Sequence, residues 1–295
     1  MRPVLVIAFA LWALAACAQR EKFVRYNLLV GRAEWCSTTG DHSAALQAYD
    51  SAFALIPFMG RDHFFAAKTA LQAGRDDRAN AILIEGVENG LPLRQYYDST
   101  VQAFLLSERA MPLLNTWDLM EQRYWSRADT ALIRALRTIG DGNRTVEDAQ
   151  GGARMERDTL AFETFVALVE QRGFPTALAV GDAIYLPQRL FREQLIDYPN
   201  DPRWRRVLPH IQRAINTGAL PPDYLCPFQD LADLARGRPL TYGALFRWMR
   251  SEKAITLAPR KRLDKARAAV GLLPIAQALV VEGMDASQVV FAEGP

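Results

Sequence analysis

The sequence predicts an all-α protein: helical hairpin repeats followed by a second, mostly helical domain. Apolar residues recur at helical spacing in most segments. One such pattern returns after 34 residues, and the predicted helices of the second half end at glycine and proline, which are common helix stops. Half of the chain is hydrophobic and 23% is charged. This balance is typical of a folded globular protein with a sizeable core.

The first residues predict an export signal. Met1 and Arg2 give a short positive start, residues 3–16 are almost entirely apolar, and the small residues Ala15 and Ala16 precede Cys17. The apolar run is shorter than the roughly 20 residues that a transmembrane helix requires. We therefore expect residues 1–16 to be a signal peptide that is removed.

The stretch Leu14-Ala15-Ala16-Cys17 resembles the bacterial lipobox. This resemblance implies that Cys17 is the lipid attachment site and the first residue of the mature protein. The next residues, Ala18 and Gln19, lack the aspartate typical of inner-membrane retention, so the resemblance implies an outer-membrane lipoprotein that faces the periplasm. An ordinary signal peptide, giving a secreted or periplasmic protein, also fits because small-x-small cleavage patterns overlap the same residues.

Composition and motifs indicate neither nucleic acid nor a cofactor as a partner. The formal net charge of +2 is too small to favour nucleic acid. The three histidines are scattered and no metal-ligand spacing occurs, so no metal site is expected. No phosphate-binding glycine loop, nucleophile elbow or distinctive carboxylate pair occurs, so we expect no cofactor and assign no catalytic residue. Cys36 and Cys226 can form one disulfide or remain two buried thiols, and the second alternative is favoured.

A 34-residue period relates residues 39–57 to the segment that begins near Gly74. Small residues stand where two helices would cross closely, and a large apolar residue stands between them. This period and pattern resemble the tetratricopeptide repeat, and residues 26–35 match its first helix. The paired positions are Ala33 and Ala67, Gly40 and Gly74, Ala45 and Ala79, Tyr49 and Leu83, Ala52 and Gly86, and Phe53 and Val87.

A third repeat is not expected from the sequence. Leu113 and Met120 replace the small residues, and Pro112 is expected to interrupt the helix. Because two repeats cannot bury both outer faces, we expect helices at residues 100–107 and 114–138 to cap the stack. Their aromatic residues are interpreted as a packing layer, in preference to a ligand cage: Phe104, Trp117, Tyr124 and Trp125.

A glycine-rich polar stretch at residues 140–152 predicts a linker between domains at residues 20–139 and 153–295. Helices are expected at residues 157–175, at residues 201–222 and after Pro259. Residues 276–284 and 287–293 can form strands or a final helix.

The second half resembles an uncharacterised family of bacterial domains, through the ordered motifs GFP, VGDA, INTG, FQDL, GRPLTYGAL and LDKARAAVGLLPI. The family has no established activity, but its polar residues suggest a buried ligand-binding or catalytic site. This chain retains Gly243 and the candidate ligand-binding residues Asp158, Asp230, Tyr242, Asp264 and Arg267. This chain lacks the family's histidine, its Asp-Arg pair has become Asp230-Leu231, and Leu240 and Leu245 replace glutamines. A structural role is therefore favoured, with Asp264 and Arg267 as a pair and Asp230 as a turn cap.

Tryptophan and basic residues also alternate at residues 203–206 and 246–253. Anionic lipid headgroups or peptidoglycan could bind them, but a tryptophan that packs inward beside solvated arginines requires no ligand. The sequence thus favours a non-enzymatic, lipid-anchored envelope protein that binds a protein or peptide partner through a helical-repeat groove. The alternatives are an enzyme or degenerate enzyme acting on an envelope polymer, and a structural part of an outer-membrane assembly.

Overall fold

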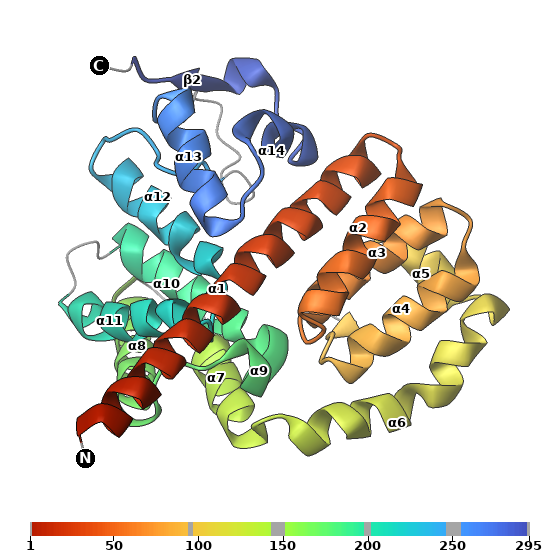
Figure 1. The fold of residues 1–295 in the computed structure, drawn as a ribbon, viewed down its shortest axis with the longest axis horizontal. Helices are drawn as coiled ribbons and strands as arrows, with labels where there is room; N and C mark the ends of the chain where they lie inside the picture. The colour runs from red at the N-terminus through yellow and green to blue at the C-terminus, as the bar shows by residue number, and fades with distance from the viewer. Residues whose placement is uncertain (1, 94–96, 143–150, 198–201, 246–254, 294–295) are drawn as a thin grey trace. The chain divides into compact units, whose positions relative to one another are not determined.

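The computed structural model confirms the all-α class (Figure 1). It describes residues 2–93, 97–142, 151–197, 202–245 and 255–293. Within these ranges, the side chains of residues 2–17, 140–142, 151–158, 193–197, 178, 189 and 286 are not described. The side chains of Asp158 and of Cys17, the predicted lipid attachment site, are thus not described. Residues 246–253 and most of the predicted linker also lie outside the described part.

The helices are α1 (Arg2–Thr38), α2 (His42–Leu55), α3 (Gly60–Gln72), α4 (Asp76–Glu88), α5 (Ser99–Leu105), α6 (Met111–Arg127), α7 (Thr130–Gly142), α8 (Gly151–Arg172), α9 (Ala177–Val180), α10 (Leu186–Asp197), α11 (Arg203–Asn216), α12 (Cys226–Ala235), α13 (Arg260–Val270) and α14 (Ile275–Val281). Short 3-10 turns lie at Glu108–Ala110, Gly181–Tyr185, Pro222–Leu225 and Ala286–Gln288. Two short parallel strands, β1 (Ile255–Leu257) and β2 (Val289–Phe291), pair Ile255 with Val289.

The chain divides into two compact units, and their boundaries differ from the predicted domains. The hairpin unit comprises Tyr26–Ile133 together with Ala177–Ile184, and the second unit comprises Met1–Arg25, Arg134–Thr176 and Tyr185–Pro295. Helix α1 therefore contributes to both units. Helices α7 and α8 also extend into the predicted linker, to Gly142 and from Gly151.

The hairpin unit follows the 34-residue period closely. Helices α2 and α4 begin 34 residues apart, and each follows a tight turn at a glycine with positive φ, Gly40 or Gly74. Helix α3 lies one period after the part of α1 that starts at Tyr26. The paired positions Ala33 and Ala67, Ala45 and Ala79, and Tyr49 and Leu83 are all almost fully buried.

Helices α5 and α6 form a further hairpin against α3 and α4, at the place where a third repeat would lie. Pro112 does not interrupt the helix; it lies in the first turn of α6, where a missing N–H leaves no intrahelical bond unmade. Leu113 and Met120 are buried. Large side chains thus pack at the positions where the first two hairpins have small residues.

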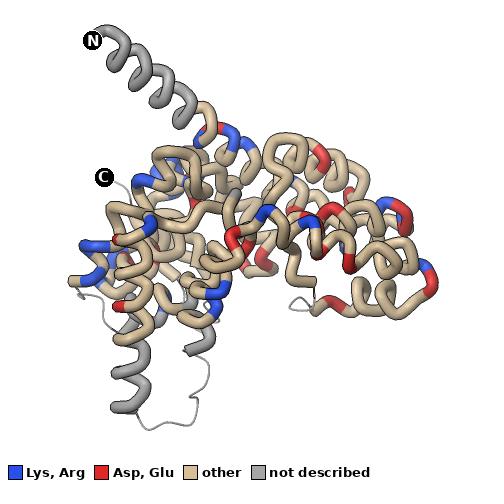
Figure 2. The backbone as a smooth tube through the Cα atoms, turned by 90° about the horizontal axis from the view of Figure 1, so that it is seen from below, with Lys and Arg blue, Asp and Glu red and all other residues tan. Residues whose placement is uncertain are grey.

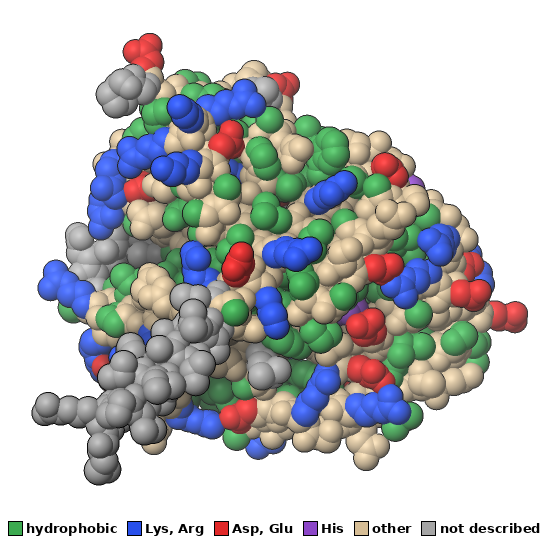
Figure 3. Space-filling view, viewed as in Figure 1, with side chains coloured by type: hydrophobic (Ala, Val, Ile, Leu, Met, Phe, Trp, Pro, Cys, Tyr) green, Lys and Arg blue, Asp and Glu red, His purple; other side chains and the backbone are tan. Residues whose placement is uncertain are grey.

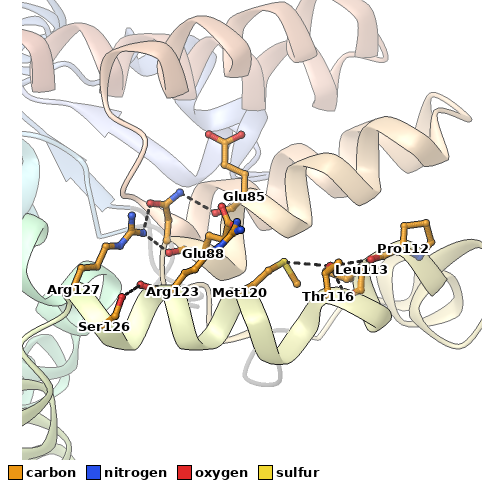
Figure 4. A network of polar contacts seen from close by, with 10 residues as sticks. Glu85, Glu88, Pro112, Leu113, Thr116, Met120, Arg123, Ser126 and Arg127 are labelled. Carbon is orange, nitrogen blue, oxygen red and sulfur yellow. Dashed lines mark hydrogen bonds and ion pairs between the residues drawn. The ribbon is translucent and has the colours of Figure 1, made fainter.

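The single capping helix expected at residues 114–138 is two helices, α6 and α7. Ala128 adopts an extended conformation that ends α6. The Asp129 carboxylate then accepts a hydrogen bond from the Leu132 N–H at 2.9 Å, which is the arrangement of an N-cap. A polar network fixes α6 to the end of α4: Arg123 pairs with Glu88, and Arg127 donates to the Asn89 side chain at 2.7 Å (Figure 4).

The second unit has an aromatic core. Phe162 of α8, Phe191 of α10 and Trp204 of α11 pack together with ring centroids 5.2–6.4 Å apart. In the basic segment at residues 203–206, Trp204 thus packs inward while Arg206 pairs with Glu163 and Glu170 outside. At the carboxyl end, where the sequence predicts either strands or a final helix, the structure has the helix α14 followed by the strand β2.

Candidate functional site

Asp230 of α12 is more deeply buried than Asp264, the other acidic residue proposed from the sequence whose side chain is described. The Asp230 carboxylate accepts hydrogen bonds from the backbone N–H groups of Tyr242 at 2.8 Å and Ala244 at 2.6 Å. Burial nevertheless raises the pKa of Asp230 to about 6, because desolvation of the carboxylate outweighs these two hydrogen bonds. Asp230 therefore holds the segment before residue 246 in place, which extends its predicted role as a turn cap.

Arg267 of α13 binds the same segment from the other side. Its guanidinium donates to the backbone oxygens of Tyr242 at 2.5 Å and Gly243 at 3.3 Å, and also to Leu273 O at 2.5 Å. Burial lowers the pKa of Arg267, but a guanidinium keeps its charge at neutral pH. The buried Asp230 carboxylate and the buried Arg267 guanidinium thus both bind the backbone of residues 242–244.

In the described part of the chain, Asp264 and Arg267 form neither a hydrogen bond nor a salt bridge within 4 Å, so they are not the predicted structural pair. Asp264 accepts the Ile275 N–H at 2.8 Å and so caps α14, while Arg267 turns to backbone oxygens. The cause is the helix geometry, because α13 buries Arg267 beside Leu263 but leaves Asp264 partly exposed.

Two further residues belong to this cluster and were not singled out as site residues from the sequence. Asp233, one turn after Asp230, accepts from Arg238 at 2.7 Å and from the Thr241 hydroxyl at 2.7 Å. Cys226 is a buried free thiol whose pKa is raised by burial and by the nearby carboxylates. For Asp233, the only signal in the sequence is its position three residues after Asp230 on the same predicted helix.

The cluster holds the segment at residues 241–244 in place. Asp230 and Arg267 bind its backbone, and Asp233 accepts from the Thr241 hydroxyl. A raised thiol pKa disfavours the nucleophilic thiolate at Cys226. These residues do come together, as a catalytic pocket would require, but their hydrogen bonds fit a clamp around residues 240–245.

A second group of buried polar residues, in the hairpin unit, was missed by the sequence analysis. Asp62 of α3 is buried and accepts the Tyr26 hydroxyl at 2.7 Å. Asp182 lies near it, on the segment Ala177–Ile184, with both carboxylate oxygens shielded from solvent and the backbone N–H of Arg61 nearby. Burial raises the pKa of Asp182 to about 7; Arg61 opposes this shift and the charge of Asp62 adds to it. Asp182 can therefore retain a proton near neutral pH.

The segment that carries Asp182 is held at the ends of three helices of the hairpin unit. Tyr124 of α6 donates its hydroxyl to Val180 O at 3.2 Å, and the Asp129 N–H donates to Ala179 O at 2.9 Å. Gly181 has a positive φ, and a Cβ there would meet Asn89 O at 3.3 Å. The segment thus occupies this edge of the hairpins as part of the same unit.

His63, next to Asp62 in sequence, also lies inside the hairpin unit. Its ring stacks on Phe53 with centroids 3.9 Å apart, and Nδ1 lies 3.1 Å from Met59 O. His63 Nε2 lies 3.7 Å from Glu85 Oε1, and this neighbour holds the pKa of Glu85 below its usual value. Among the described residues, no three histidine, cysteine or acidic side chains come together as a metal site would require.

The comparisons with known proteins found no match: no family model, no curated protein and no solved structure resembles this chain. In the described part of the chain, no helix has the length and apolar character to cross a membrane.

Proposed function

We propose that this chain is a lipid-anchored protein of the cell envelope, held at the outer membrane through Cys17 and facing the periplasm. In this proposal it catalyses no reaction and binds a partner protein through its helical hairpin unit. The lipobox-like residues before Cys17 support the anchor. The repeated hairpins support binding, because stacked hairpins, whether or not they are tetratricopeptide repeats, present extended helical surfaces to partners.

The observation that carries the binding proposal is the apolar surface of the last hairpin. Leu106 is 88% exposed, and Met111 and Leu114, one turn apart on α6, are 46% and 44% exposed. Leu119 and Trp125 are exposed further along the same helix. The outer face of a terminal repeat is normally polar because it meets water. Exposed apolar residues there favour a binding surface.

The opposite side of α6 shows why this surface is available to a partner. Its inward residues pack on α4: Leu113 and Met120 are buried, and the polar contacts of Arg123 and Arg127 fix the helix in place (Figure 4). The outer residues therefore project from a rigid support. Their one-turn spacing fits the apolar face of an amphipathic helix, which we propose as the bound element of the partner.

The helical-repeat groove that the sequence predicts as the binding site has less support than the outer face of α6. Most residues of α3, the inner helix, are buried, including Asp62 and Phe64. Binding through the outer face of α6 does not require any of these side chains to be uncovered. The proposed enzyme activity of the second unit has less support again, because its polar cluster binds backbone.

Crosslinking in intact envelopes tests the binding proposal with two matched double variants. Met111→Glu with Leu114→Glu should reduce the crosslinked partner at least about tenfold, because charges would enter an apolar interface. The control is Leu208→Glu with Leu234→Glu, in which the replaced side chains are 46% and 44% exposed on the second unit. The control should retain the partner. Equal crosslinking by both variants, with both folded by circular dichroism, would overturn the proposal.

A further inference from the structure

The outer face of α13 carries basic residues without an acidic residue among them. Leu263, Arg267 and Val270 form the buried face of this helix. Lys261, Arg262 and Lys265 are exposed on the opposite side, next to the exposed Ala268 and Ala269. The only carboxylate of α13, Asp264, is partly exposed between these two faces, where it lies 3.8 Å from Arg260 and caps α14 through Ile275 N. Lysine and arginine side chains gather at this part of the surface (Figure 3).

This basic face continues into the start of the mature chain. Arg20 of α1 donates to Ala269 O of α13 at 3.3 Å, so a fourth cation is placed at the end of the row. Gln19 packs against Gly218, where a Cβ would come within 2.6 Å of the Gln19 side chain. Two independent contacts therefore hold residues 19 and 20 against the second unit.

Further basic residues follow on α1 itself. Lys22 and Arg25 are exposed, whereas Glu21 is the only acidic residue between Cys17 and Arg25. Figure 2 shows positive charges on the first described turns of α1. Arg20 follows Cys17 by three residues, which is about 4.5 Å along a helix. A lipid on Cys17 would bring Arg20 and Lys22 within a Debye length of the membrane surface, about 8 Å at physiological ionic strength.

We propose that Arg20 of α1 and Lys261, Arg262 and Lys265 of α13 form a surface that binds the anionic headgroups of the membrane that holds the lipid anchor. This inference rests on the proposed anchor, and it adds a second attachment that fixes how the second unit faces the bilayer. A lipid chain leaves the protein free to rotate, whereas a basic face beside the chain favours one orientation. Each basic residue near an anionic surface strengthens binding, and salt weakens it.

Vesicle sedimentation tests this surface separately from lipidation. The mature chain with Cys17→Ser, which cannot be acylated, is mixed with vesicles of phosphatidylcholine alone or of phosphatidylcholine with phosphatidylglycerol. We expect binding only to the second kind, with loss of binding in ~0.5 M salt as the charges are screened. Absence of binding to the anionic vesicles at low salt would overturn the inference.

A matched pair of charge-reversal variants tests whether α13 is responsible. Lys261→Glu, Arg262→Glu and Lys265→Glu together should weaken vesicle binding roughly tenfold to a hundredfold. The control, Arg75→Glu, Arg134→Glu and Arg213→Glu, makes the same change in net charge at exposed arginines on other elements. Equal losses in the two variants would show an effect of net charge alone and contradict the assigned surface. If the wild-type chain carries no acyl chain in cells while the Cys17→Ser chain still binds anionic vesicles, only the proposed anchor is contradicted.

Discussion

Asp230 in the second unit and Asp182 in the hairpin unit are both acidic residues with buried carboxylate oxygens, yet their surroundings differ. Two backbone N–H groups donate to Asp230, and Arg267 holds the same backbone from the other side. Near Asp182, the backbone N–H and the charge of Arg61 favour the ionised carboxylate, whereas the charge of Asp62 disfavours it. Burial raises the pKa of both, but further for Asp182. The comparison teaches that a raised pKa alone does not distinguish a structural clamp from a group that retains a proton.

The largest expected effect comes from breaking the clamp. Arg267→Leu should destabilise the second unit by about 3–5 kcal/mol, because it leaves three backbone oxygens without their donor and removes the positive charge near the buried Asp230. Chemical denaturation followed by circular dichroism measures the change. Arg262→Leu on the exposed face of the same helix is the control and should leave stability nearly unchanged. A wild-type-like midpoint for Arg267→Leu would show that the clamp does not support the fold.

The next effect depends on pH. The pKa of Asp182 is raised in the folded state, so its stabilising contribution is complete below the ordinary value of 3.8 and is lost as the pH rises through about 7. Wild-type stability should therefore fall by roughly 2–4 kcal/mol between pH 4 and pH 8 through this group.

Asp182→Asn should remove most of this pH dependence, because the amide cannot ionise. The raised pKa of Asp230 leaves a smaller decline through pH 6 in the variant. Thermal unfolding at pH 5 and pH 8 measures both proteins. The same pH dependence in wild type and variant would contradict a proton held by Asp182.

A smaller effect tests the close helix packing of the first hairpin. Ala52 is fully buried on α2, so Ala52→Trp should cost at least ~1–3 kcal/mol through overpacking. Ala54, two residues later on the same helix, is exposed, and Ala54→Trp should be nearly neutral. Thermal melting of the two variants compares the faces directly. Equal melting temperatures would contradict the assigned crossing.

The sequence predicted the helices better than the polar sites. Periodic apolar residues such as Ala45 and Ala79 mark faces that are buried by neighbours along the chain, so local spacing was sufficient. The break at Ala128 was missed because the apolar pattern continues across it, and Pro112 was misread because a proline suits the first turn of a helix as well as a break.

The candidate sites depend on contacts between distant parts of the chain. Asp230 and Arg267 were named from the sequence, but only the fold shows that both bind the backbone near Tyr242. Asp62 and Asp182 meet because the segment Ala177–Ile184 joins the hairpin unit after the chain has left it. No local spacing of residues predicts this return of the chain to the hairpin unit. The VGDA motif, which contains Asp182, was the only feature of the sequence that drew attention to this segment.

The most direct test of the account is the intact mass of the mature chain purified from envelopes. We predict a chain that begins at Cys17 and carries two or three acyl chains, and a Cys17→Ser variant that is released from membranes. An unmodified amino terminus after cleavage at another residue, or a chain that still begins at Met1, would contradict the anchor on which the proposed function depends.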